Sequence, residues 1–162
     1  VLFRSCFAVF FAQQKQYHAI FRSCNAGSKT DSWCGHCPKC LFVYLILSPF
    51  LSEEEVEKIF GRNMLQDEEM KPLLDQLTGI QEEKPFECVG SRDEINSAIV
   101  LTIERMEKEG KKLPLLFEHY KETGLYERYQ TEKNKFSAYF DSSNLVPEPW
   151  EKFVRERCTK EA

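Results

Sequence analysis

Apolar residues recur along most of this chain with the spacing of an amphipathic α-helix. The longest such face is made by Ile95, Ala98, Ile99, Ile103 and Met106. It follows a capping box that begins at Ser91, and Gly110 ends the helix. A second capping box begins at Ser52 and opens a helix predicted to reach Phe60, where Gly61 stops it. These two segments predict helices with defined starts and ends.

Most of the remaining chain also has the apolar spacing of α-helices, and one segment is predicted to be a strand. Further helices are predicted over 6–16, 41–47, 67–77, 114–124 and 148–157, several of them bounded by Pro or Gly. Segment 17–22 is short and rich in apolar residues, and we expect it to be the last strand of a sheet. His119 is predicted to be a partly buried or surface histidine, because no second ligand lies at helical spacing. The chain is therefore predicted to be mostly α, with at most one or two strands.

Composition narrows the classes of partner. The net charge is −4 over 162 residues, and the basic residues are interspersed with acidic ones instead of forming a basic face, which argues against nucleic acid. The longest apolar stretch, 41–51, is interrupted at Ser48-Pro49 and is about half of the ~20 residues that span a bilayer, so no membrane segment is expected. The cysteines and the absence of a signal peptide predict a cytoplasmic protein.

The start of the chain carries two further hints. There is no initiator Met, and residues 1–5 read like translated sequencing adapter, so we leave them out of the argument. Segment 6–11 begins directly in an apolar run without a polar cap. We therefore expect the chain to begin inside a domain of a longer protein.

Four cysteines in a short stretch carry the strongest chemical signal. Cys24, Cys34, Cys37 and Cys40 have the spacing Cys-x9-Cys-x2-Cys-x2-Cys, which is typical of a structural Zn²⁺ site. Four thiolates complete a tetrahedron and leave no open position for catalysis. His36 could replace one thiolate, although a ring that points outward is the preferred interpretation. Two disulfides or a redox Cys-x-x-Cys pair are the alternatives.

Two motifs resemble one enzyme family. The first motif is the zinc region, which consists of Ser23-Cys24-Asn25, the run from Trp33 to Val43, and Ser48-Pro49-Phe50-Leu51. The second motif is Lys84-Pro85-Phe86-Glu87-Cys88-Val89-Gly90, followed by Arg92-Asp93-Glu94. In this order they resemble the ATP-dependent UDP-N-acetylmuramoyl-L-alanyl-L-glutamate epimerases over roughly residues 6–130. The cysteine spacing alone is shared with 7-cyano-7-deazaguanine synthases, whose fold is an α/β adenine-nucleotide α-hydrolase-like domain.

The resemblance implies a fold and a division of the chain. Residues 6–51 would be the end of the α/β nucleotide-binding domain with its zinc loop, and 52–162 a helical C-terminal region. Relatives of this fold bind ATP through a Ser-Gly-Gly-x-Asp-Ser type of loop, and this sequence contains none. ATP and Mg²⁺ are therefore expected to bind an N-terminal half of the same protein, and the chain alone is expected to be inactive.

The resemblance also implies a reaction. ATP would adenylate the α-carboxylate of the terminal L-Glu in UDP-MurNAc-L-Ala-L-Glu, and the activated α-carbon would then be inverted for peptidoglycan synthesis. Inversion needs a base on one face of that carbon and a proton donor on the other. Two alternatives stay open: another ATP-pyrophosphatase such as a deazaguanine synthase-like ligase, and a zinc-stapled helical interaction module without enzymatic activity.

The second motif supplies the candidates for catalysis. Cys88 is the first candidate for proton transfer, because a thiol close to a helix N-terminus can have a lowered pKa, although the more ordinary interpretation is a small buried apolar residue. Glu87 is a candidate base or Mg²⁺ ligand, with a surface carboxylate as the alternative. Arg92 and Asn25 are candidates for binding substrate; Arg92 could instead be solvated, and Asn25 could bond the backbone of the zinc loop.

Overall fold

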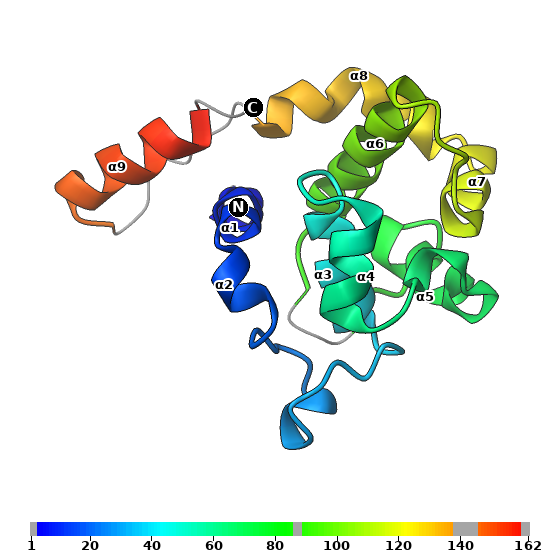
Figure 1. Cartoon of the computed structure of the whole chain (residues 1–162). Coiled ribbons are helices and arrows are strands. Elements are labelled where there is room, and N and C mark those ends of the chain that lie inside the picture. Colours follow the sequence, from blue (N-terminus) through cyan, green and yellow to red (C-terminus); the bar gives the residue numbers. More distant parts are fainter. Residues whose placement is uncertain (1–2, 86–88, 138–145, 160–162) are drawn as a thin grey trace.

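The structure is a computed structural model that describes residues 3–85, 89–137 and 146–159 (Figure 1). Its helices are α1 (Phe3–Gln13), α2 (Lys15–His18), α3 (Pro38–Leu47), α4 (Glu53–Phe60), α5 (Lys71–Thr78), α6 (Arg92–Lys108), α7 (Leu115–Glu122), α8 (Leu125–Ser137) and α9 (Glu148–Thr159). Short 3₁₀ turns occur at Gly27–Lys29, Met64–Gln66 and Glu68–Met70. No strand occurs among these described residues, and the mostly helical prediction is confirmed.

The predicted strand at 17–22 is wrong. Lys15–His18 form helix α2, and the amides of Ile20 and Phe21 both donate to the carbonyl of Tyr17, at 3.2 and 3.0 Å. An apolar run this short fits either a strand or a helical turn, and only a neighbouring strand would decide for the first. Here the backbone groups find their partners locally, within a turn.

Helix α6 is the centre of the core. Its residues Ile95, Ile99, Ile103 and Met106 are completely buried, as the sequence pattern predicted. Helix α8 packs along α6, and α3 and α5 contact it from other sides. In Figure 1 these helices form one group together with α4 and α7, whereas α1, α2 and α9 lie beside it.

Both predicted capping boxes are present. Ser52 Oγ accepts from the amide of Glu55 at 3.3 Å, and Glu55 Oε2 accepts from the amide of Ser52 at 3.0 Å. The second box pairs Ser91 and Glu94 in the same way. These reciprocal bonds satisfy donors that a helix start otherwise leaves free, which is why a local sequence signal located both starts.

Several predicted helix boundaries move. The single helix predicted over 6–16 is divided at Gln14 into α1 and α2. The segment predicted as a helix from Asp67 begins instead with a 3₁₀ turn, and α5 itself starts at Lys71 with Pro72 in its first turn. Proline fits there because the first turn needs no amide donor. Helix α7 begins after Pro114 and buries Leu116, Phe117 and Tyr120. No helix in the described part of the chain is long and apolar enough to cross a bilayer.

Candidate metal centre

The four cysteines of the predicted zinc site come together where the loop 19–37, called here the cysteine loop, meets α3. The Sγ atom of Cys24 lies 3.3 Å from that of Cys34 and 3.6 Å from that of Cys37. Cys40 Sγ lies 3.6 Å from Cys34 Sγ and 3.5 Å from Cys37 Sγ. A disulfide bond is about 2.05 Å long, so these sulfurs are not bonded to one another. The arrangement is a cluster of four free thiols.

The separations fit a single tetrahedral ion. With Zn–S bonds of about 2.3 Å, the sulfurs of a tetrahedron lie ~3.8 Å apart, and all four ligand atoms here lie within 4.8 Å of one another. Among the described residues, these cysteines are the group that could hold a metal ion. Soft thiolate donors in this number favour Zn²⁺, and four protein ligands close the coordination sphere. The site is thus suited to holding structure and offers no position for a substrate.

Backbone amides support two of the sulfurs. The amide of Gly27 donates to Cys24 Sγ at 3.3 Å, and the amide of Cys40 donates to Cys37 Sγ at 3.4 Å. Cys37 is the N-cap of α3 and Pro38 occupies the first turn. The partial positive charge at the start of α3 therefore faces a sulfur that carries negative charge when it binds a metal.

Glycine is required at two points of the cysteine loop. Gly35 has φ +73°, a left-handed conformation that side chains with a Cβ rarely adopt. At Gly27 a Cβ would lie 1.8 Å from the carbonyl oxygen of Ser32, so the loop would have to open. These two residues let the chain turn tightly enough to bring Cys24 against the later cysteines.

The thiols differ in their tendency to ionise. Burial opposes ionisation of Cys24, but hydrogen bonds from the amides of Gly27 and Cys34 and from neighbouring thiols outweigh it and lower its pKa to about 6. Burial raises the pKa of Cys37 to about 11 and also raises the pKa of Cys40. Without a cation the cluster therefore favours few thiolates, and a divalent ion supplies the charge that would stabilise all four.

His36 lies outside the cluster, in agreement with the outward orientation expected for it. Its ring is exposed, with Nδ1 and Nε2 at 3.2 and 3.3 Å from Nη1 of Arg62. Arg62 in turn forms an ion pair with Asp67. These contacts hold the cysteine loop against the segment between α4 and α5.

Aromatic rings connect the cysteine loop to the helices. Trp33 is buried, and its ring centroid lies 4.5 Å from that of Phe60 on α4 and 5.5 Å from that of Phe21. Phe21 contacts Phe11 of α1, and Phe60 contacts Tyr44 of α3, at 4.7 and 5.1 Å. This aromatic row joins α1, the cysteine loop, α4 and α3. Sequence reasoning missed it, because the rings come from distant parts of the chain.

The other candidates from sequence lie in separate places. Asn25 is exposed beside Cys24 in the cysteine loop. Arg92, at the start of α6, donates from Nη2 to the carbonyls of Gln81 and Glu82 at 3.1 and 2.6 Å. Glu87 and Cys88 lie outside the described residues. Neither Asn25 nor Arg92 belongs to the metal cluster.

The described residues on either side of 86–88 contact each other. Lys84 Nζ donates to the carbonyl of Gly90 at 2.7 Å. A Cβ on Gly90 would lie 2.7 Å from the ring of Phe42 and 2.8 Å from Glu94 Oε2, so the backbone passes close to α3 and α6 there. Glu94 itself is 5% exposed, and the capping box identifies its role at the helix start.

Two polar contacts were not anticipated. His119 is partly buried, as expected, but its Nε2 lies 2.8 Å from Oδ1 of Asp75, which links α7 to α5. Asn96 is fully buried on α6 and bonds the hydroxyl of Tyr120. A polar residue at a buried helical position is a signal that could have pointed to such a partner.

Comparison with known proteins places this architecture in a family. Residues 20–131 match the family model described as MurL C-terminal domain. The chain is 42% identical over 99 residues to a UDP-N-acetyl-alpha-D-muramoyl-L-alanyl-L-glutamate epimerase of Micromonospora sp.. The aligned residues cover 59% of this chain and 22% of that relative. The protein of the same name from Xanthomonas oryzae pv. oryzae is 41% identical over 103 residues, 60% of this chain and 23% of the relative. No solved structure matches.

The chain belongs to the MurL C-terminal domain family, because the match covers more than half of its residues. The resemblance seen in the cysteine loop and in the Lys84 to Gly90 motif is thereby confirmed. The chain spans about a fifth of the length of the curated relatives that it matches.

Proposed function

We propose that the complete protein carrying this chain is an ATP-dependent epimerase that inverts the terminal L-Glu of UDP-MurNAc-L-Ala-L-Glu in peptidoglycan synthesis. The observation that carries the proposal is the match of residues 20–131 to the C-terminal domain of relatives that bear the epimerase name. The substrate is then a UDP-linked muramoyl dipeptide, and the site of action a bacterial cytoplasm.

The cysteine cluster takes a structural part in this proposal. Cys24, Cys34, Cys37 and Cys40 would hold Zn²⁺ and fasten the cysteine loop to the start of α3. Their closed coordination supports stability of the domain and excludes a role for this ion as a Lewis acid. The chemistry belongs to other groups.

Activation of the carboxylate explains why ATP would be needed. A carboxylate oxygen attacks the α-phosphorus of ATP, pyrophosphate leaves, and an acyl adenylate forms. Loss of the α-proton from a free carboxylate would place a second negative charge beside the first, whereas the adenylate delocalises that charge into its carbonyl. Return of a proton to the opposite face and hydrolysis then give the D-glutamyl product and AMP.

Proton transfer is assigned to the segment after Lys84. Cys88 would exchange the α-proton, and Glu87 would tune it or bind Mg²⁺. The contact from Lys84 to the carbonyl of Gly90 supports this proposal, because it joins described residues on either side of 86–88, shortly before the start of α6. A thiol ahead of that helix end would be favoured as a thiolate.

Asn25 and Arg92 remain the proposed contacts to substrate. The hydrogen bonds from Arg92 to two backbone carbonyls support a positioning role, in which the Arg92 side chain holds residues 81–82 against α6. Its remaining guanidinium donors would then face a carboxylate or phosphate of the substrate. In domain terms, 6–51 would complete a nucleotide-binding domain and 52–162 would form its helical extension.

The proposal is tested by comparing the complete protein with the 162-residue chain. Both are incubated with UDP-MurNAc-L-Ala-L-Glu, ATP and Mg²⁺ in D₂O, and the glutamyl α-proton is followed by NMR while AMP is measured by chromatography. We expect deuterium incorporation, inversion and AMP only with the complete protein. Inversion without ATP, or formation of a new amide or nitrile in place of a D-glutamyl product, would overturn the proposal.

Titration calorimetry with ATP and Mg²⁺ adds a binding test. The complete protein should bind in the micromolar range, and the 162-residue chain weakly or not at all. Micromolar binding by the chain alone would show that its own residues form the nucleotide site.

A further inference from the structure

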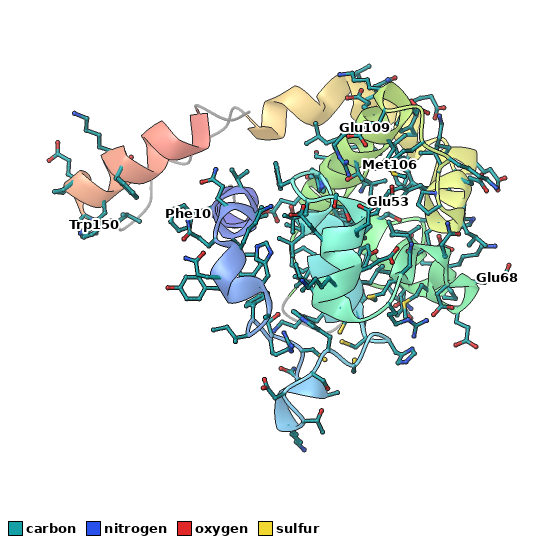
Figure 2. All side chains as sticks on the ribbon, viewed as in Figure 1. Phe10, Glu53, Glu68, Met106, Glu109 and Trp150 are labelled. Atoms are coloured by element: carbon teal, nitrogen blue, oxygen red, sulfur yellow. The ribbon has the colours of Figure 1, made fainter. Side chains whose placement is uncertain are left out.

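Helix α1 has more apolar surface than the rest of the described chain covers. Residues 8–12 read Ala-Val-Phe-Phe-Ala, so apolar positions surround this part of the helix between its polar residues Ser5 and Gln13. Ala8 and Ala12 are buried, and Phe11 is partly buried against the core. Phe10 is 43% exposed on the side of α1 turned away from the main helical group (Figure 2). A helix that is apolar all round is normally buried on all sides.

Exposed apolar side chains continue from α1 onto its neighbours. Tyr17 on α2 is 51% exposed, and Ile20 just after it is 68% exposed. Helix α9 packs against α1 and adds Trp150 and Phe153, whose rings are 6.4 Å apart and which are 64% and 44% exposed. We call these five residues the flank surface. They are five of the seven large apolar side chains that the described residues expose, and exposed apolar side chains gathered on neighbouring elements usually mark an interaction site.

The flank surface is carried by elements that are fixed to the domain. Lys15 Nζ on α2 lies 2.6 Å from Glu55 Oε1 on α4, and His18 Nε2 lies 3.0 Å from the carbonyl of Phe11. The rings of Phe11 and Phe21 continue the aromatic row into the cysteine loop. The part of the flank surface on α1 and α2 is therefore held in a defined orientation, and α9 is placed by its contact with α1.

The comparison with relatives indicates what covers it. The family match begins at residue 20 and ends at residue 131, so α1 and α2 precede the C-terminal domain and α9 follows it. These two flanks nevertheless contact each other. The curated relatives are several times longer than the matched region. This chain covers about a fifth of their length. The segments that flank the family match thus contact each other and expose large apolar side chains, in a family whose curated members have a large additional region.

We propose that the flank surface is the docking face for the upstream region of the complete protein, which meets the C-terminal domain through an apolar interface centred on Phe10, Ile20 and Trp150. Only the identity of that region as the ATP-binding part rests on the proposed function. The interface itself follows from the exposed side chains, of which four lie outside the family match and one, Ile20, is its first residue.

The test compares one pair of substitutions in two contexts. Phe10→Glu with Ile20→Glu places charges on the flank surface, and Ile80→Glu is the matched control, since Ile80 is 40% exposed after the end of α5. Hydrogen exchange of residues 8–20 and limited proteolysis are measured in the 162-residue chain and in the complete protein. Neither measurement needs substrate or ATP, so failure of the epimerase proposal would leave the result standing.

We expect residues 8–20 to exchange at least tenfold more slowly in the complete protein than in the chain alone. The double variant should abolish that difference and speed cleavage between the upstream region and residue 20, while Ile80→Glu changes neither. Equal exchange in the two contexts, or a double variant that behaves like the control, would overturn the proposal. So would sedimentation showing that the chain alone is a dimer which the double variant converts to monomer, because the surface would then join two copies.

Discussion

Tyr120 donates its hydroxyl proton to Oδ1 of Asn96 at 2.7 Å, where neither side chain reaches solvent. Asn96 Nδ2 in turn donates to the carbonyls of Thr78 and Arg92, at 3.0 and 2.7 Å. Burial raises the pKa of Tyr120, so the phenol stays a neutral donor. One buried amide thus connects the end of α5, the start of α6 and the second half of α7.

Breaking this contact should destabilise the domain. Asn96→Ala leaves the Tyr120 hydroxyl and the Thr78 carbonyl without a partner, and each unsatisfied buried group costs about 1–3 kcal/mol. Tyr120→Phe should cost less, about 1 kcal/mol, because Asn96 keeps two of its bonds. Urea unfolding of both variants and of the double variant gives their coupling, expected at about 0.5–3 kcal/mol. Tyr17→Phe, on an exposed tyrosine, should change nothing; strict additivity of the pair would contradict the prediction.

The chain should bind one Zn²⁺. Metal analysis of protein purified under reducing conditions is expected to give one equivalent, and Cys40→Ser should lose most of it. The loss should lower Tm by ~6–12 °C if the site contributes about 3 kcal/mol, well below the ~10–16 kcal/mol of zinc-finger peptides. His36→Ala is the control: it should keep the metal, and its Tm should fall much less, since only an exposed contact with Arg62 is lost. Cooperative folding with less than a tenth of an equivalent of zinc would refute the assignment.

The aromatic row should be a major contributor to stability at the cysteine loop. Phe60→Ala removes the ring that contacts both Trp33 and Tyr44, and a buried phenylalanine truncated to alanine typically costs ~3–5 kcal/mol. Phe50→Ala, at a position 37% exposed, should cost much less. Thermal unfolding of the two variants distinguishes them. Similar losses of Tm would show that the row adds little to the fold.

Proton transfer can be separated from activation in the complete protein. Cys88→Ser should leave substrate-dependent AMP formation largely intact while slowing α-proton exchange with D₂O by ~10²–10⁴-fold, the usual contribution of a general acid or base. Cys158→Ser serves as a control outside the motif. If exchange proceeds at the parental rate, Cys88 is a packing residue and another group moves the proton.

The contact between α2 and α4 should respond to acid. The hydrogen bond from Lys15, together with that from the Ser52 amide, lowers the pKa of Glu55 below its ordinary value. Because the folded value is the lower one, the stabilisation is present above the unfolded pKa of about 4.3 and is lost as pH falls through the folded value. The loss of Tm between pH 5 and 3 should therefore be smaller in Glu55→Gln than in the parent. An identical decline would show that the pair contributes nothing.

Local signals in the sequence predicted more of this structure than distant ones. The capping boxes at Ser52 and Ser91 act within four residues, and the cysteine spacing limits how far four sulfurs can separate. The segment 17–22 failed because its apolar content does not distinguish a strand from a turn. The contact of Asn96 with Tyr120 and the stacking of Trp33 on Phe60 join residues 24 and more positions apart, and no periodicity along the chain encodes such pairs.

The two tryptophans give the molecule a built-in optical readout. Trp33 is buried between Phe21 and Phe60 beside the cysteine cluster, whereas Trp150 is largely exposed on α9. Their emission should accordingly differ in wavelength and in quenching by acrylamide, with Trp33 the blue-shifted and protected fluorophore. Chelation of the metal would shift the emission of Trp33 and leave that of Trp150 unchanged. Docking of another region onto α9 would shift the emission of Trp150 and leave that of Trp33 unchanged. A single unlabelled sample can therefore report separately on metal binding and on assembly.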